Sequence, residues 1–222
     1  MPLGKEWREY LELVRQRPEE FRQDTRLKLV LNETCAESFE QECGQKIGVL
    51  YRSPYHILVA DLVEAEGRLF RYERILPAAA GSVVAVPVWE GRFLLLRQFR
   101  HAIRQLQYGF PRGFGEPGIP ARDNVKKELA EELHAPVHAV RRLGVVTADS
   151  GLSGGWTEVF LCRVGKPEIA PPYEGIVSLE ALTRAELEEW IRRGEITDGF
   201  TLAAYGLLCC GEQPAPDARG SR

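Results

Sequence analysis

The stretch GFGEPGIPARDNVKKELAEELHA, from Gly113 to Ala135, decides the fold of this 222-residue chain. Its first part belongs to a loop, residues 109 to 120, that is dense in glycine and proline, so the backbone there takes unusual angles or approaches another group closely. Its second part, from Asp123 to Leu133, is helical by content. The stretch therefore predicts a structured loop that leads directly into a helix.

The helix carries three carboxylates at a spacing that matters chemically. Glu128, Glu131 and Glu132 lie at i, i+3 and i+4, so at 3.6 residues per turn they share one face, beside an apolar stripe of Val125, Leu129 and Leu133. Crowded carboxylates repel one another, and a hard divalent cation with oxygen ligands relieves that repulsion. The alternative is a solvated acidic face, which is common on soluble helices.

The rest of the chain combines strand and helix patterns. Alternating apolar residues predict strands at 47–51, 56–64, 68–76, 82–89, 92–99, 143–147 and 158–164, with tight turns at Glu66-Gly67 and Glu90-Gly91. Thr183 with Glu186 reads as a capping box that opens a helix ending at Gly194, and a last helix follows at about 200–209. Hairpins before a single central helix favour a mixed α+β fold over a doubly wound sheet.

Three parts of the chain differ in composition. Residues 1–44 are charged and helix-prone and predict an N-terminal helical extension, interrupted near Pro18. Residues 45–211 carry the strand patterns and the carboxylate helix, and we expect them to form the main domain with an N-terminal β-hairpin. Residues 212–222 read as a disordered tail.

Charge and cysteine content limit the functional classes. A net charge of -3 creates no field that would recruit nucleic acid or an acidic membrane, so a polyanionic substrate must be met by local cations. No apolar run is long enough to span a bilayer, and the first residues mix charges where a secretory signal would be apolar. The 5 cysteines form no C-x-x-C pair. We expect a cytoplasmic protein with reduced thiols, Cys162 and Cys209 lying in the core.

The loop and helix resemble the Nudix box, whose pattern is G, five residues, E, seven residues, then R-E-U-x-E-E-x-G-U with U apolar. Gly113, Glu128, Leu129, Glu131 and Glu132 match in register. Four positions depart from the pattern: Ile119 replaces the first glutamate, Lys127 the arginine, His134 the glycine and Ala135 the last large apolar residue.

These departures have physical consequences. In the family the first glutamate and the arginine form mainly a structural ion pair, so their joint replacement by Ile119 and Lys127 can be compensated without loss of metal ligands. His134 must take a left-handed conformation where the helix ends, at a cost of about 1 kcal/mol relative to glycine. Catalysis is therefore compatible with the altered box.

Two further blocks extend the resemblance to the ADP-ribose pyrophosphatase-type members of the family. They are SVVAVPVWEGRFLLLRQFRHAIRQLQYGFPRG, before the box, and GEITDGFTLAA, from Gly194 to Ala204. The resemblance implies a Nudix α/β/α sandwich with a mixed sheet, and a homodimer, because members of this type are usually dimeric. One position again differs, since Gly109 stands where these members usually have a glutamate.

The resemblance also implies a metal site. Glu128 and Glu132 are expected to hold Mg²⁺, with Mn²⁺ as a substitute, assisted by Glu131 and by the main-chain carbonyl of Arg112. Glu116 in the loop is an auxiliary ligand or a solvated charge. Metals at this position would neutralise a diphosphate and orient a water molecule.

Substrate contacts and the general base are open to alternatives. Arg97 and Arg100, with Gln98 between them, are candidates for gripping phosphate or ribose, although arginines on a strand surface are common. The base in such members comes from a loop after the box, where Glu174 lies, with Glu168 nearby. The segment TADSGLSGGWTE brings in Glu158 as a candidate near the substrate, against a polar residue that opens a strand.

The function favoured by these patterns is Mg²⁺-dependent hydrolysis of ADP-ribose, or of a related nucleoside diphosphate sugar, to a nucleoside monophosphate and a sugar phosphate. The expected partner is thus a small nucleotide, with no nucleic acid and no membrane. One alternative is another nucleoside diphosphate derivative or a dinucleotide. A second is a non-catalytic ligand-sensing protein, which Ile119, Lys127 and Gly109 favour and which the three helix carboxylates disfavour.

Overall fold

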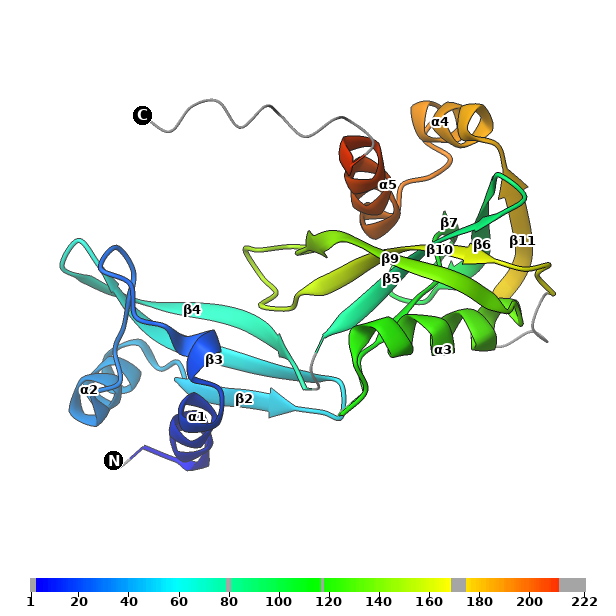
Figure 1. The fold of residues 1–222 in the computed structure, drawn as a ribbon. Helices are drawn as coiled ribbons and strands as arrows, with labels where there is room; N and C mark the ends of the chain where they lie inside the picture. The colour runs from blue at the N-terminus through cyan, green and yellow to red at the C-terminus, as the bar shows by residue number, and fades with distance from the viewer. Residues whose placement is uncertain (1–2, 79–80, 117, 169–174, 212–222) are drawn as a thin grey trace, which may run out of the picture. The chain divides into compact units, whose positions relative to one another are not determined.

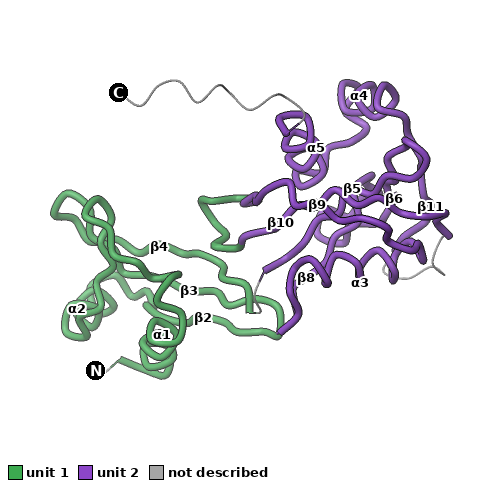
Figure 2. The backbone as a smooth tube through the Cα atoms, in the orientation of Figure 1, with its two compact units in different colours: residues 1–79, 149–155 green, residues 80–148, 156–222 purple. Residues whose placement is uncertain are grey.

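The computed structural model describes residues 3–78, 81–116, 118–168 and 175–211. The chain divides into two compact units (Figure 2): the first comprises residues 1–79 and 149–155, and the second residues 80–148 and 156–222. Each unit has its own hydrophobic core.

The first unit is a four-stranded antiparallel sheet with two α-helices (Figure 1). Strand β3 is central: β1 and β2 pair with different ends of it along one edge, and β4 pairs with it along the other edge. Its elements are α1 (Lys5–Gln16), the 3-10 helix η1 (Pro18–Phe21), β1 (Lys28–Leu29), α2 (Glu33–Cys43), β2 (Gly48–Arg52), β3 (His56–Ala65) and β4 (Arg68–Pro77). Trp7, Tyr10 and Leu13 lie on the buried side of α1, so its helical spacing places one apolar stripe against the sheet.

The second unit is a seven-stranded mixed sheet between helices. Its order is β11-β6-β5-β10-β9; β7 pairs with β6 and β8 with β5. The β5–β10 pair is parallel, whereas the other pairs are antiparallel. The elements are β5 (Ser82–Trp89), β6 (Arg92–Arg100), β7 (Gln105–Gly109), β8 (Arg112–Phe114), α3 (Ala121–Leu133), β9 (Val137–Val146), β10 (Thr157–Val164), β11 (Ile176–Leu182), α4 (Arg184–Arg192) and α5 (Gly199–Gly211).

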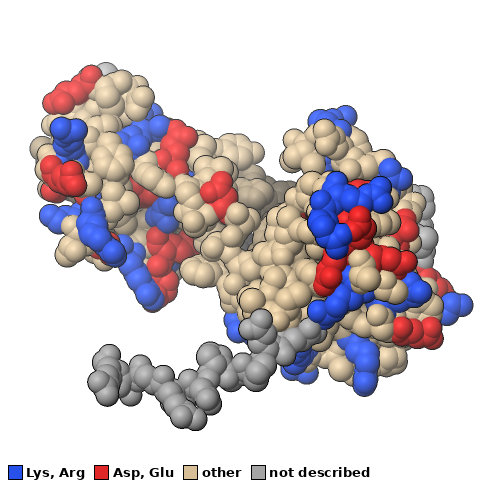
Figure 3. Space-filling view, turned by 90° about the horizontal axis from the view of Figure 1, so that it is seen from above, with Lys and Arg blue, Asp and Glu red and all other residues tan. Residues whose placement is uncertain are grey.

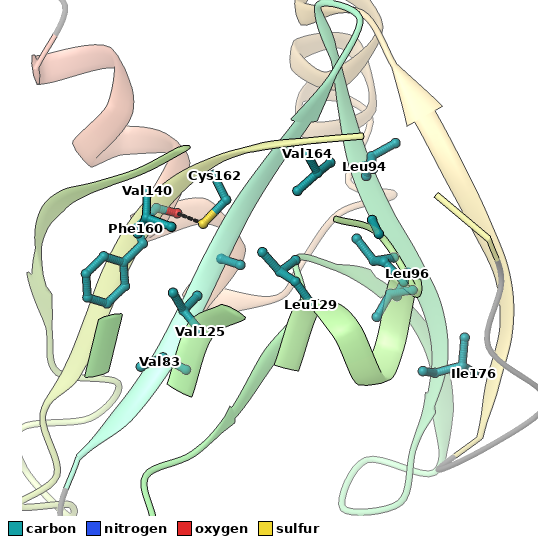
Figure 4. Packing of buried hydrophobic residues seen from close by; sticks show 13 residues of the cluster. Val83, Leu94, Leu96, Val125, Leu129, Val140, Phe160, Cys162, Val164 and Ile176 are labelled. Atoms are coloured by element: carbon teal, nitrogen blue, oxygen red, sulfur yellow. Dashed lines mark hydrogen bonds between the residues drawn. The ribbon is translucent and has the colours of Figure 1, made fainter. Parts of the chain in front are cut away.

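One face of this sheet packs against α3 (Figure 4). Val125, Leu129 and Leu133 are fully buried against strand residues such as Leu96 and Phe160, which confirms the predicted apolar stripe. Cys162 lies in the same cluster, and its burial raises the pKa of the thiol to about 12. The second predicted core cysteine, Cys209, is only half-buried, and all five thiols are free.

The opposite face of the sheet packs against α4 and α5 through Leu187, Ala204 and Leu208. Thr183 and Glu186 form the predicted capping box, and the carboxylate of Glu186 accepts the Thr183 backbone N–H at 2.7 Å. These hydrogen bonds lower the pKa of Glu186. The α3 layer, the sheet and the α4/α5 layer together form an α/β/α sandwich (Figure 1).

Most of the expected elements are present, and some were missed. The patterns predicted β2 to β6, β10, α3, α4 and α5 within a few residues, and Glu66-Gly67 and Glu90-Gly91 turn with positive φ as expected. They did not predict β1, β7, β8 or β11, and they predicted β9 only from residue 143. Short strands beside glycines and prolines lack a clear alternation. The expected tail, 212–222, lies outside the described residues.

The units do not follow the divisions suggested by composition. We expected a boundary between residues 44 and 45, but β2, β3 and β4 lie with α1 and α2 in the first unit. The reason is that Ile47, Val49, Ile57 and Val59 share a core with Trp7 and Tyr10.

On the face drawn in Figure 3, basic and acidic side chains are interspersed, and neither charge dominates. Among the helices of the described residues, none is long and apolar enough to cross a bilayer.

Candidate functional site

Strand β8 presents a main-chain edge to helix α3. Pro111 accepts the Ala85 N–H at 2.9 Å, and the Gly115 N–H is donated to Gly81 at 2.6 Å. Because residues that bond to a neighbouring antiparallel strand alternate with residues that point away, Arg112 turns its N–H and C=O away from β5.

The next outward residue shows what this edge faces. The carbonyl of Phe114 accepts a hydrogen bond at 3.0 Å from the Asn124 amide, which is on α3. Since the outward carbonyls of one strand edge point the same way, the Arg112 carbonyl also points towards α3. Glu128 lies one helical turn after Asn124 and so shares the side of α3 that Asn124 turns to the strand.

Gly113 explains how closely the helix approaches the strand. A Cβ placed on Gly113 would overlap the carboxylate of Glu128. Only glycine therefore allows this carboxylate to rest against the strand backbone, beside the Arg112 carbonyl. The glycine and the glutamate that matched the box in register are thus in direct contact in the structure.

The other two helix glutamates differ in burial. Glu132, one further turn along the same side as Glu128, is 8% exposed. Glu131 is exposed, and its carboxylate lies 3.6 Å from the Lys127 ammonium. Glu128 and Glu132 therefore form the inner part of the acidic face, and Glu131 forms its outer rim.

Lys127 also forms an ion pair with Glu116 of the loop. A hydrogen bond from Lys127 to this carboxylate is the main cause of the raised pKa of the lysine. Ile119, which replaces the first glutamate of the box, is more than a third exposed. A loop-to-helix ion pair is therefore present, with its acid three positions earlier than in the Nudix pattern.

The helix ends as the sequence predicted. His134 has φ 46° and ψ 29°, in the left-handed region. The Glu168 N–H donates to the Leu133 carbonyl at 2.8 Å, which satisfies one of the last carbonyls of the helix. The position that is glycine in the box thus keeps its backbone conformation with histidine.

Glu158 lies on the α3 face of the sheet. It is two residues before Phe160 of the α3 core and pairs in register with Val83, which in turn pairs with Gly113. Its carboxylate accepts a hydrogen bond from Arg142 Nε at 2.5 Å. Glu158 is thus at the same level of the sheet as the Gly113–Glu128 contact, and Arg142, which pairs with Phe160, reaches it from β9.

The predicted substrate residues on β6 lie on two different faces. Leu96 belongs to the α3 core and Leu95 to the α5 core, so Gln98 and Arg100 follow the α3 face and Arg97 the opposite one. Consistently, the Arg97 guanidinium lies 5.5 Å from the ring centroid of Tyr108, a residue packed against the α5 core.

Of the two candidates for the general base, Glu168 lies in the described part of the chain. Glu174 lies outside the described residues. Glu168 is described; its side chain is exposed, and its backbone is anchored to the end of α3. The choice between these two glutamates therefore stays a prediction.

The residues present fit a divalent metal ion. A carboxylate pressed against Gly113, an outward carbonyl at Arg112 and the buried Glu132 give hard oxygen donors on one side of α3. Within the described part of the chain, no three His, Cys, Asp or Glu side chains are close enough to form a ligand group by themselves.

Comparison with known proteins assigns the chain to a family. The NUDIX domain matches residues 79–200, more than half of the chain. The chain belongs to the Nudix family. No curated protein matches it by sequence.

A solved structure supports the Nudix fold independently. The crystal structure of an ADP compounds hydrolase aligns with a TM-score of 0.65 over 73% of this chain and 89% of its own, at 16% sequence identity. At this identity the likeness shows the fold, and it confirms the predicted α/β/α sandwich. As a Nudix member the chain is a pyrophosphohydrolase, and such hydrolases use divalent metal ions.

Sequence reasoning did not single out three residues that contact the candidate site residues or β8: Arg142, which donates to Glu158, Asn124, which donates to the Phe114 carbonyl, and Asp198, whose carboxylate lies 3.3 Å from the Arg112 guanidinium. Applying strand alternation to β9 could have suggested that some of its arginines face α3, but a register shift in that strand hides which ones. Asn124 carried a weak signal, as a polar residue one turn before Glu128. Asp198 carried only the signal of a helix N-cap.

Proposed function

We propose that this Nudix domain hydrolyses the pyrophosphate bond of ADP-ribose, or of a related nucleoside diphosphate sugar, with Mg²⁺. The observation that carries the proposal is the contact of the Glu128 carboxylate with Gly113, beside the outward Arg112 carbonyl and one turn from buried Glu132. The structural likeness to an ADP compounds hydrolase supports the substrate class.

Glu128, Glu132 and the Arg112 carbonyl would hold the metal, and Glu131 would assist from the rim. A divalent cation there neutralises diphosphate charge and makes a bound water more acidic. Glu116 is engaged with Lys127, so we assign it first to the loop-to-helix ion pair and only second to the metal.

Side chains on the α3 face would hold the substrate. Gln98 and Arg100 follow this face on β6, and Arg142 adds a guanidinium next to Glu158. Guanidinium groups bind phosphate oxygens through two parallel N–H donors. Arg97, on the opposite face, is expected to contribute little, which gives a matched pair of variants: Arg100→Ala should raise KM and Arg97→Ala should not.

We assign the general base to Glu174, with Glu158 near the reacting diphosphate. Glu174→Gln should lower kcat much more than it changes KM, whereas Glu168→Gln should leave both close to wild type. Steady-state kinetics on both variants checks this. The reverse ranking would transfer the role to Glu168, and two nearly normal variants would remove both residues from the mechanism.

Assembly and location form the last part of the proposal. We propose a homodimer that acts in the cytoplasm. Five free thiols accord with a reducing compartment, and Leu69 and Phe70 leave apolar area exposed on the edge strand β4. Light scattering coupled to size exclusion tests the dimer, and a monomer at micromolar concentration would contradict it.

The substrate is tested directly on purified protein with Mg²⁺. ADP-ribose, other nucleoside diphosphate sugars, dinucleotides and nucleoside triphosphates are each supplied, and the products are identified by chromatography. AMP and ribose 5-phosphate from ADP-ribose and one water are the expected products. Preference for another sugar nucleotide or a dinucleotide would redefine the substrate. Binding without hydrolysis, with Mg²⁺ or Mn²⁺, would leave a ligand-sensing Nudix protein.

A further inference from the structure

A buried carboxylate lies on the opposite side of β8 from helix α3. Asp198 is 5% exposed and caps α5, where its Oδ2 accepts the Thr201 N–H at 3.0 Å and the Thr201 hydroxyl at 2.7 Å. A helix cap needs only one oxygen acceptor. The second oxygen of Asp198 is therefore available for another contact.

That second oxygen reaches the strand. Asp198 Oδ1 lies 3.3 Å from Arg112 Nη2, and the Arg112 guanidinium also lies 4.8 Å from the ring centroid of Phe200. In addition, the Phe110 N–H donates to the Thr201 hydroxyl at 2.9 Å. The start of α5 thus holds the chain at two points immediately before and within β8.

Gly109 shows how tightly this contact is built. A Cβ at Gly109 would lie 3.2 Å from the Thr201 hydroxyl and 3.4 Å from Asp198 Oδ2. A Cβ there would require the Thr201 hydroxyl to shift by a few tenths of an ångström, and a longer side chain would need more room. The absence of a side chain at position 109 therefore allows Asp198 and Thr201 to approach the strand.

Helix α3 holds the same strand from the opposite side. Asn124 is 1% exposed and donates to the Phe114 carbonyl, while its own Oδ1 lacks a hydrogen-bond partner among the described residues. A buried polar atom without a partner is unfavourable. The hydrogen bond from its amide N–H to the Phe114 carbonyl is therefore the contact that connects Asn124 to the strand.

We propose that Asp198 and Asn124 are positioning residues, which hold β8 from its two sides and set the Arg112 carbonyl against Glu128 for the divalent metal. The inference rests on the metal site of the proposed function. In this proposal both side chains act through β8 and neither is a ligand of the metal. Their effect is to restrict the strand, so that a main-chain ligand is already in place before the metal binds.

The test measures Mn²⁺ binding to the full-length protein without substrate, from the free Mn²⁺ signal in electron paramagnetic resonance. Asp198→Asn keeps an oxygen for the cap and removes the charge that faces Arg112, so the ion pair that restrains the strand is lost and Mn²⁺ should bind about tenfold more weakly. Asn124→Ala should weaken binding in the same direction. Hydrogen exchange of the Gly113 amide should be faster in both variants.

Two controls separate positioning from general loss of stability. Asn32→Ala removes the cap of α2, where the Asn32 side chain accepts the Cys35 N–H, and Asp61→Asn removes the acid of a buried ion pair in the first unit. Both should bind Mn²⁺ like the wild type. Arg112→Gln removes the same ion pair from its other end, and it replaces Asp198→Asn if that variant does not fold.

The outcomes distinguish this inference from the proposed function. Wild-type Mn²⁺ affinity in folded Asp198→Asn or Arg112→Gln overturns the role of Asp198, even if the wild type hydrolyses ADP-ribose. Faster exchange at Gly113 with unchanged Mn²⁺ affinity also overturns it, because the strand would then be loosened without effect on the metal. A wild-type protein that binds no Mn²⁺ would instead contradict the metal site itself.

Discussion

Two buried aspartates, one in each unit, hold an arginine in different ways. Asp61 uses both oxygens on neighbouring elements: Tyr10 donates to one at 2.5 Å and Arg74 Nε to the other at 2.6 Å. Asp198 divides its oxygens between the cap of α5 and Arg112, which is 3.3 Å away. The first pair connects α1 and two strands of the first sheet, whereas the second connects the start of α5 to β8, the strand beside α3.

The surroundings of the arginines reinforce the difference. Arg74 also donates to the Glu20 carbonyl and lies over the Phe21 ring, so it joins η1 to the sheet. Burial and the nearby Asp61 carboxylate raise the pKa of Tyr10, which keeps the phenol protonated as a donor. The same pair of residue types thus joins η1 to the sheet in one unit and, in the proposal above, restrains the strand beside α3 in the other.

The largest expected effect is on stability, in the first unit. Asp61→Asn leaves the Arg74 charge without its carboxylate and should destabilise the protein by about 3–5 kcal/mol, as for one broken partner of a buried ion pair. Chemical denaturation measures the change. An equal loss in Asp198→Asn would remove the contrast between the two pairs.

The next largest effect is expected on turnover, from loss of a metal ligand. The Asp198–Arg112 pair is proposed to position this metal site. Glu132→Gln should reduce Mg²⁺-dependent turnover about a hundredfold, because a ligand lost from a preorganised site costs several kcal/mol in the transition state. Circular dichroism should show an intact fold. Normal turnover in the folded variant would refute the assignment of Glu132.

A third prediction sharpens the comparison at position 109. Gly109→Glu introduces a side chain whose Cβ would stand 3.4 Å from Asp198 Oδ2, together with a second negative charge. We expect a loss of about 1–3 kcal/mol in stability from overpacking, and weaker Mn²⁺ binding. Gly109→Ala should show a smaller loss of the same sign. A stable Gly109→Glu protein with normal affinity would show that Asp198 can be displaced without consequence.

The smallest effect concerns an ion pair at the surface, unlike the two buried pairs. Lys127→Glu places a third acid beside Glu116 and Glu131 and should lower turnover by a few-fold at most, since exposed pairs contribute little. The double variant Glu116→Lys with Lys127→Glu restores a pair of opposite charge and should recover most of the loss. Failure of the double variant to recover would mean that Glu116 or Lys127 has a direct role at the site, and Glu116→Gln alone then separates the two.

The sequence alone determined the local features of the site. The spacing of Glu128 and Glu132, the apolar stripe of α3, the left-handed His134 and the capping box at Thr183 were all predictable. The physical reason is that helix periodicity, caps and turns depend on residues a few positions apart, whose geometry is set by the backbone itself.

Only the tertiary structure decided which distant residues meet. Three contacts follow from how the strands pair and how the helices pack on them. Lys127 pairs with Glu116, β2 to β4 share a core with α1, and Asp198 reaches Arg112. No local pattern encodes these contacts, because a charged residue or a short apolar strand can be satisfied by several partners. Closure of the chain around each core selects one of them.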